Sequence, residues 1–250
     1  QDGDPFEHVF QRMRIRVFKP LLVYGFRHAI RIQALSYFLA DWARSAGAKC
    51  HVLVIPNGVD VEKFAPSLEE KTHAGVRLIT TSRLVKKNGV GDVISALKHL
   101  PSGVKFQIIG AGVLEQSLKR QVAKLGLENR VEFLGHVANH ELPYHLHQAD
   151  IFIRPSLSEG QGISFIEAMA AGLPVIATPV GGIPDFLKDG GTGIFCQPEN
   201  PESIARAVKR LIDDPTLAER VRETALRMVR KDYDWNLIAA EMRSRVFQPL

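Results

Sequence analysis

Residues 77–110, RLITTSRLVKKNGVGDVISALKHLPSGVKFQIIG, predict a strand, a helix and a second strand in that order. The runs at 77–82 and 105–110 combine apolar and β-branched residues, as short buried strands do, and a helical pattern lies between them at 89–100. Strands that alternate with helices form a parallel sheet. This stretch therefore predicts an α/β fold.

The same alternation continues to the end of the chain. A helix is predicted over 113–126, because apolar residues at 114, 118, 122 and 125 share one face and Gly126 follows as a cap. Further strands are predicted at VEFLG, IFIRPS, VIAT and GIFC, and further helices at 201–214, 216–231 and 235–247. We expect a doubly wound parallel sheet with helices on both faces.

The opening part has a different composition. Basic residues at 9–31 are mixed with a helical stripe of apolar ones, and Pro20 marks a start or a kink. One strand at 31–36 and one helix at 37–47 follow. The stretch at 52–75 is rich in turn residues and polar, so a domain boundary is expected there, near Asn57 and Gly58.

Composition limits the class of protein. With 250 residues, 45% hydrophobic and 24% charged, the chain is typical of a soluble globular protein, and no apolar stretch approaches the roughly 20 residues that cross a membrane. Cys50 and Cys196 lack metal-ligand spacing, which fits a reducing compartment and a cytoplasmic location. Because the chain starts at Gln1 without a signal sequence, we expect further sequence upstream.

A net charge of +5 favours anionic partners such as phosphates. The basic opening segment has two interpretations, contact with an anionic membrane surface at its periphery or a helix between domains with a solvated face.

Residues 158–179, SEGQGISFIEAMAAGLPVIATP, predict the functional site. Gly160 and Gly162 would let the N–H groups of a helix start approach a phosphate closely. Carboxylates repel phosphate, but Glu159 and Glu167 could accept hydrogen bonds from sugar or ribose hydroxyls. The competing interpretation is a capping box, since Glu167 follows Ser164 by three residues.

These glutamates resemble the E-x7-E element of the retaining GT-B glycosyltransferases of family GT4. Other segments resemble that family in the same order, namely VIPNGVDVEKF, SRLVKKNGV, IIGAG, VEFLGHV and AGLPVIATPVGGIPDFLKDGGTGIF, so that the similarity covers about residues 34–247. The resemblance implies a remnant of an N-terminal domain at 1–56, a Rossmann-like donor-binding domain at 57–234, and a C-terminal helix at 235–250 that packs back toward the N-terminal part.

The resemblance also implies roles for individual residues. Glu159 would bind hydroxyls of the donor sugar and Glu167 those of the ribose, while Arg83 would neutralise the diphosphate leaving group. The remaining expected donor contacts are N–H groups around Gly162, Ile163 and Ser164, the loops at Gly110 and Gly112, and His136 and Val137 near the base. One position departs from the family pattern, because Asn88 replaces its usual lysine, and Lys87 would reach in instead.

The implied activity is transfer of a hexosyl group, with retention, from a nucleoside diphosphate sugar to a glycan or a lipid-linked acceptor. We expect no metal, no other cofactor and no nucleic acid partner, and we expect this chain alone to bind donor without turnover. Two alternatives stay open, an inactive nucleotide-sugar binding module and a sugar-nucleotide epimerase of the GT-B fold.

Two other site types are disfavoured by spacing. Gly110 and Gly112 form a G-x-G after a strand, but the third glycine of a dinucleotide site is absent. The histidines match no common zinc spacing and fit a helix face better; they are His136, His140, His145 and His147.

Overall fold

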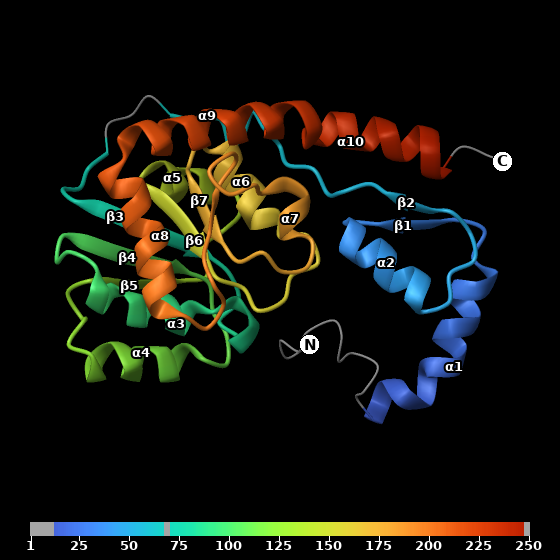
Figure 1. The fold of residues 1–250 in the computed structure, drawn as a ribbon, viewed down its shortest axis with the longest axis horizontal. Helices are drawn as coiled ribbons and strands as arrows, with labels where there is room; N and C mark the ends of the chain where they lie inside the picture. Colours follow the sequence, from blue (N-terminus) through green and yellow to red (C-terminus); the bar gives the residue numbers. More distant parts are fainter. Residues whose placement is uncertain (1–12, 68–70, 248–250) are drawn as a thin grey trace.

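The computed structural model describes residues 13–67 and 71–247. Six strands form one parallel sheet in the order β5-β4-β3-β6-β7-β8 (Figure 1). Their bounds are β3 Val76–Thr81, β4 Val104–Ile109, β5 Val131–Gly135, β6 Ile151–Arg154, β7 Val175–Ala177 and β8 Ile194–Phe195. The predicted doubly wound α/β fold is confirmed.

Helices cover both faces of this sheet. Alternate residues of each strand point to opposite faces, so Ile151 and Ile153 join one core and Phe152 joins the other. The first core contains residues of α3 (Val90–Ala96), α4 (Glu115–Lys124) and α8 (Pro201–Asp213). The second contains residues of α5 (Leu142–His147), α6 (Ile163–Ala170) and α7 (Ile183–Phe186).

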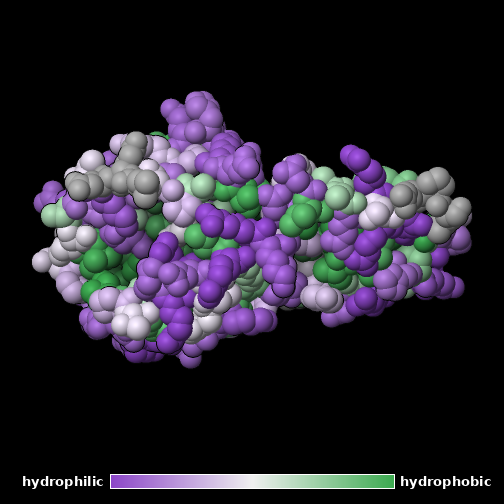
Figure 2. All heavy atoms as spheres, turned by 90° about the horizontal axis from the view of Figure 1, so that it is seen from above, coloured by the Kyte–Doolittle hydropathy of each residue, from purple (hydrophilic) through white to green (hydrophobic). Residues whose placement is uncertain are grey.

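Helix α9 (Pro215–Asp232) contributes to both cores. Leu217 and Val221 belong to the first core, and Ala225 and Val229 belong to the second. Seen from the side of α9, the surface is mostly hydrophilic, with hydrophobic residues in small groups (Figure 2). Because α9 packs against both cores, it bridges the helix layers on the two faces of the sheet.

The strand order places a switch point between β3 and β6. From β3 the chain proceeds outward to β4 and β5, and from β6 it proceeds in the other direction to β7 and β8. In open parallel sheets, ligands bind beyond the carboxyl ends of the strands at such a point, because the two flanking loops diverge there. The residues that follow Thr81 and Arg154 therefore flank the expected crevice.

A small lobe, residues 13–56, precedes this domain. It consists of α1 (Met13–His28), β1 (Ile32–Ala34), α2 (Tyr37–Ser45) and β2 (Val52–Val54), and β1 pairs in parallel with β2. Strand β2 was not predicted, because it lies at the start of a stretch dominated by turn residues. The predicted strand and helix at 31–47 correspond to β1 and α2.

Helix α1 contains Pro20 and exposes many apolar side chains, namely Val17, Phe18, Leu21, Leu22 and Tyr24. Residues 9–12 of the predicted stripe lie outside the described residues. Membrane contact through this helix stays a prediction. Between residues 13 and 247, as far as the structure describes them, no helix is long and apolar enough to cross a membrane.

The last helices connect the domain to the small lobe. Helix α10 (Trp235–Met242) continues as a π-helical turn, Arg243–Phe247, and runs alongside the small lobe (Figure 1). Ile238 packs with Leu53 and Ile55 of the lobe. The Arg31 side chain donates hydrogen bonds to the carbonyls of Arg245 and Val246, at 3.0 and 2.8 Å.

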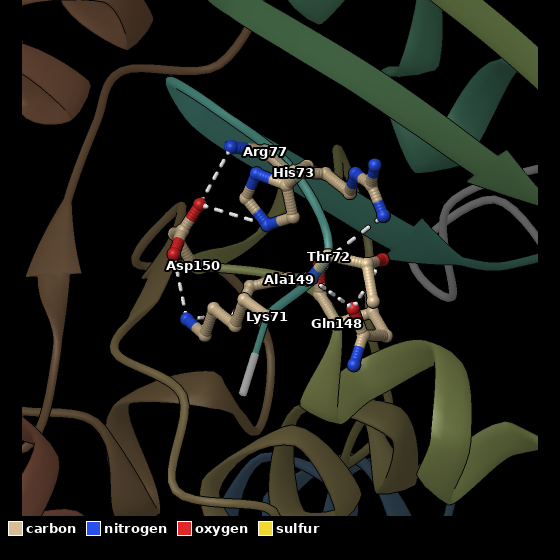
Figure 3. Close-up of polar contacts among 7 residues, drawn as sticks. All are labelled: Lys71, Thr72, His73, Arg77, Gln148, Ala149 and Asp150. Atoms are coloured by element: carbon tan, nitrogen blue, oxygen red, sulfur yellow. Dashed lines mark hydrogen bonds and ion pairs between the residues drawn. The ribbon is translucent and has the colours of Figure 1, made fainter. Parts of the chain in front are cut away.

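Polar contacts fix the chain where it enters β3, at the amino ends of the strands (Figure 3). The Asp150 carboxylate accepts from the Lys71 ammonium at 2.6 Å and from the Arg77 backbone N–H at 2.7 Å. The Gln148 side-chain oxygen accepts from the backbone N–H and the hydroxyl of Thr72, at 2.9 and 3.0 Å. These contacts lie at the opposite end of the sheet from the crevice.

Candidate functional site

Two loops follow the carboxyl ends of the central strands β3 and β6, where a crevice is expected. The first, residues 82–89, follows β3, and the second, residues 155–162, follows β6 and leads into α6. The Leu157 N–H donates to the Lys87 carbonyl at 2.7 Å, which joins the loops directly. Gly89 has φ of 66°, and a Cβ there would lie 2.2 Å from the Pro155 carbonyl oxygen. Only glycine permits this close approach.

Glu159 lies in the second loop and is held by an arginine. Its Oε2 accepts from Nη2 of Arg154 at 2.7 Å, and its Oε1 accepts from the Gly160 N–H at 3.1 Å. The side chains of Arg154 and Glu159 are 8% and 14% exposed. Burial lowers the pKa of Arg154, and the charges of Glu159 and Glu167 act in the opposite direction. The pair is a largely buried ion pair at the carboxyl end of the central strands.

The capping-box interpretation is wrong. Helix α6 begins after Gly162, which has φ of 91° and provides no side-chain cap. Ser164 lies inside the first turn, and its hydroxyl accepts from Nη1 of Arg154 at 2.7 Å. Because α6 starts at Ile163, the first N–H groups have no intrahelical acceptor and are available to an anion.

Glu167 lies further along α6 and is partly buried. Burial is the largest effect on its pKa and raises it, whereas the nearby charges of Lys63 and Arg154 lower it. Lys63 in turn donates a hydrogen bond to the Asn139 side chain. No side chain in the described parts of the chain donates a hydrogen bond to the Glu167 carboxylate. This carboxylate is therefore oriented by its helix and open to a ligand.

The loop after β3 carries Arg83, Lys87 and Asn88. Asn88 is buried, and its amide donates to the Arg83 carbonyl at 2.7 Å. Position 88 therefore supports the loop from inside, which explains how a neutral residue fits there. Arg83 is exposed and Lys87 is half-buried, and within the described residues neither side chain has a carboxylate partner. Both cations are therefore available to an anion.

Gly110 and Gly112 pack the next loop against the Arg83 loop. A Cβ at Gly110, whose φ is 128°, would lie 1.9 Å from the Ser82 carbonyl oxygen, and one at Gly112 would lie 2.5 Å from that of Leu84. The G-x-G spacing is thus explained by close backbone contact.

The predicted base-contacting residues follow β5. His136 is exposed, and Val137 packs beside the second core. Among the described residues, no group of three or more histidine, cysteine, aspartate or glutamate side chains could hold a metal ion.

Sequence reasoning missed two side chains of this site. Arg154 ends an otherwise apolar strand, and a charge in such a run was the available signal. Gln161 exchanges two hydrogen bonds of 2.9 Å with the backbone of Asn57, and a single sequence carries no sign of this contact.

Several buried polar atoms near the strand ends lack a hydrogen-bond partner within the described residues, namely Arg154 Nε and the hydroxyls of Thr80, Thr81, Ser82 and Ser156.

Comparisons with known proteins agree with this geometry. The family model for glycosyl transferases group 1 matches residues 60–228. A glycogen synthase of Mycobacterium tuberculosis is 32% identical over 191 residues, covering 75% of this chain and 46% of the relative. A GDP-mannose-dependent alpha-(1-6)-phosphatidylinositol monomannoside mannosyltransferase of the same organism is 30% identical over 225 residues, covering 83% and 58%. The chain spans about half the length of these curated relatives.

Solved structures show the same fold. Anabaena Alr3699/HepE in complex with UDP-glucose has a TM-score of 0.88 at 24% identity, over 98% of this chain and 71% of that one. A sucrose-phosphate synthase from Thermosynechococcus elongatus has a TM-score of 0.85 at 22% identity, over 94% and 62%. Because the family model matches more than half of the chain and similar relatives cover most of it, the protein belongs to the glycosyl transferases group 1 family.

Proposed function

We propose that this chain binds the nucleoside diphosphate sugar donor of a retaining hexosyltransferase. The observation that carries the proposal is Glu167, a partly buried carboxylate without a described hydrogen-bond donor, one turn along a helix whose N-terminus opens at the switch point. A carboxylate in that position is suited to a pair of ribose hydroxyls, and the helix start is suited to a phosphate. Relatives named for GDP-mannose and structures with UDP-glucose support this donor class.

In this proposal each group at the crevice has one task. The ion-paired Glu159 accepts hydrogen bonds from hydroxyls of the sugar, and the N–H groups around Ile163 and Ser164 hold the distal phosphate. Arg83 and Lys87 offset the negative charge that grows on the departing diphosphate. This account uses no metal ion, because fixed protein charges and N–H groups stabilise the leaving group.

Residues 57–234 form the donor-binding domain in the proposal, with 1–56 as the remnant of the acceptor-side domain and 235–250 as a C-terminal helix that packs back toward it. The acceptor, a glycan or a lipid-linked sugar, would bind mainly to polypeptide outside this chain. Full activity is therefore expected only from a longer protein, and donor binding is the activity expected of these 250 residues.

Calorimetric titration of the chain with UDP, GDP and ADP, in buffer containing a metal chelator, tests the proposal. Saturable binding of one nucleotide, unaffected by the chelator, is the expected result and would identify the base. If a folded chain binds none of them at millimolar concentration, the proposed donor site is wrong. An exposed carboxylate far from the crevice, Glu128, supplies a control variant that should not change the binding.

A further inference from the structure

Arg154 is a charged residue at a place where a charge is costly. It is the last residue of β6, in the middle of the sheet, and only 6% of its surface is exposed. Burying a guanidinium is unfavourable unless hydrogen bonds and an opposite charge compensate it, and an apolar residue is often better for stability. Its presence at the end of an apolar strand therefore suggests a task other than packing.

The contacts of Arg154 all lead to the crevice. Nη2 donates to Glu159 in the loop before α6, and Nη1 donates to Ser164 in the first turn of α6, each at 2.7 Å. The guanidinium carbon lies 4.3 Å from the ring centre of Phe165, in a cation–π contact. Nη1 also lies 3.4 Å from the Thr81 carbonyl at the end of β3. One rigid side chain thus connects two strands, the loop and the helix start.

We propose that Arg154 is a positioning residue of the donor site, which fixes the Glu159 carboxylate toward the sugar of a nucleoside diphosphate sugar and offsets its charge beside the diphosphate. The inference rests on the proposed function. Glu159 uses one oxygen for Arg154 and the other for the Gly160 N–H, and each oxygen retains a lone pair for a sugar hydroxyl. Its orientation is therefore set before the donor arrives.

The charge balance gives Arg154 its second task. Two carboxylates, Glu159 and Glu167, lie beside the expected diphosphate, and each would repel it. The other charged group that acts on Glu167 is Lys63, from the segment after the small lobe. Arg154 acts on both glutamates. Removing its charge should leave Glu159 uncompensated, and neutralising Glu159 should then relieve the repulsion.

A four-member set of proteins tests this coupling, namely the native chain, Arg154→Met, Glu159→Gln and the double variant. Each is titrated with UDP and UDP-glucose and with GDP and GDP-mannose, and the pair that the native chain binds is followed. Arg154→Met should weaken binding of the nucleoside diphosphate by at least about tenfold, because at an effective dielectric constant of about 20 a unit-charge interaction exceeds about 1.4 kcal/mol out to roughly 12 Å. It should weaken binding of the nucleoside diphosphate sugar by about a further tenfold, because the Glu159 carboxylate is no longer held toward the sugar.

The double variant separates positioning from a structural role. It should recover most of the affinity for the nucleoside diphosphate, while the affinity for the sugar donor stays as low as in Glu159→Gln. Arg154→Lys keeps the charge but loses the planar guanidinium with its paired N–H donors. This variant should retain its affinity for the nucleoside diphosphate and lose part of the additional affinity that the sugar contributes. Recovery of binding by a second neutralising substitution is not expected if Arg154 only stabilises the fold.

Arg130→Met is the matched control. Burial also lowers the pKa of Arg130, but its guanidinium donates to the carbonyls of Val104 and Pro101, at the amino ends of the strands. This variant should lower the melting temperature and leave both affinities unchanged. The inference is overturned if the double variant binds the nucleoside diphosphate as weakly as Arg154→Met does. It is also overturned if Arg130→Met loses as much affinity as Arg154→Met. A native chain that binds neither pair overturns the proposed function and this inference with it.

Discussion

Replacing Glu167 by glutamine separates its effect on stability from its effect on binding. Burial raises the pKa of Glu167, so the folded chain holds this proton at higher pH than the unfolded chain, whose reference value is 4.5. Folding stability from this group is therefore present at low pH and is lost as pH rises from about the unfolded value through the folded one. Glutamine keeps the shape and removes the buried charge. At pH 7 to 8 the variant should be at least as stable as the native chain, and the difference should shrink toward acidic pH.

Binding should change in the opposite direction. Because no described side chain donates to the Glu167 carboxylate, both of its oxygens are open to ribose hydroxyls. Glutamine keeps one acceptor oxygen and loses the charge, so at least one charge-assisted hydrogen bond is lost. Such a bond is worth about 1.5 to 3 kcal/mol, which corresponds to a roughly 10- to 150-fold weaker Kd for the nucleotide.

Urea denaturation from pH 5 to 8 and calorimetric titration at pH 7.5 measure the two effects on the same samples. Glu128→Gln, at an exposed position, should change neither. A Glu167→Gln protein that is less stable by about 1 kcal/mol at pH 8 and binds nucleotide normally would refute the reasoning, because that result is the signature of a helix-stabilising residue.

Three further outcomes are expected. Gly162→Ala should cost about 1 to 3 kcal/mol of unfolding free energy and abolish nucleotide binding, because φ is 91° and a Cβ would lie 2.4 Å from the Phe165 ring. Gly126, with φ of 65° and open space where a Cβ would lie, supplies the control: Gly126→Ala should cost less and bind nucleotide normally. Urea denaturation and titration measure the two effects. Asp150→Asn should lower stability by about 1 to 3 kcal/mol in urea with unchanged nucleotide affinity, since its contacts lie at the far end of the sheet. Asn88→Ala should weaken nucleotide binding measured by titration, because the Arg83 carbonyl loses its 2.7 Å hydrogen bond; an unchanged Kd would show that the loop does not depend on it.

The parallel sheet was predictable because its strands and helices repeat a simple pattern. The strand predicted at 77–82 is observed at Val76–Thr81, and the helix predicted at 216–231 is observed at Pro215–Asp232. Strand β2 was not predicted, since three apolar residues before a turn-rich stretch give a weak signal and the pairing with β1 is a tertiary contact. Local pattern determines an element only where it is long enough to repeat.

The site was predictable in its glycines and less so in its charges. Gly110 and Gly112 lie where backbones approach closely, and Gly162 has the positive φ of a helix start, which sequence spacing can suggest. The role of Ser164 was not predictable, because its partner Arg154 lies ten residues earlier on another element. Asn88 likewise has a role only once its amide is seen to hold the Arg83 carbonyl. Side chains that act through a partner are invisible to spacing alone.

The two hydrogen bonds between Gln161 and the backbone of Asn57 connect the loop that carries Glu159 to the segment that leads from the small lobe into the domain. A second connection runs from the Asp185 carboxylate, on α7, to the Tyr37 N–H at the start of α2, at 2.9 Å. A rotation of the small lobe must therefore either carry α7 with it or break the Asp185–Tyr37 bond, and it would also strain the Gln161–Asn57 contact directly after the lobe. The orientation of the lobe is thus expected to be mechanically coupled to the segment that carries the Glu159 carboxylate.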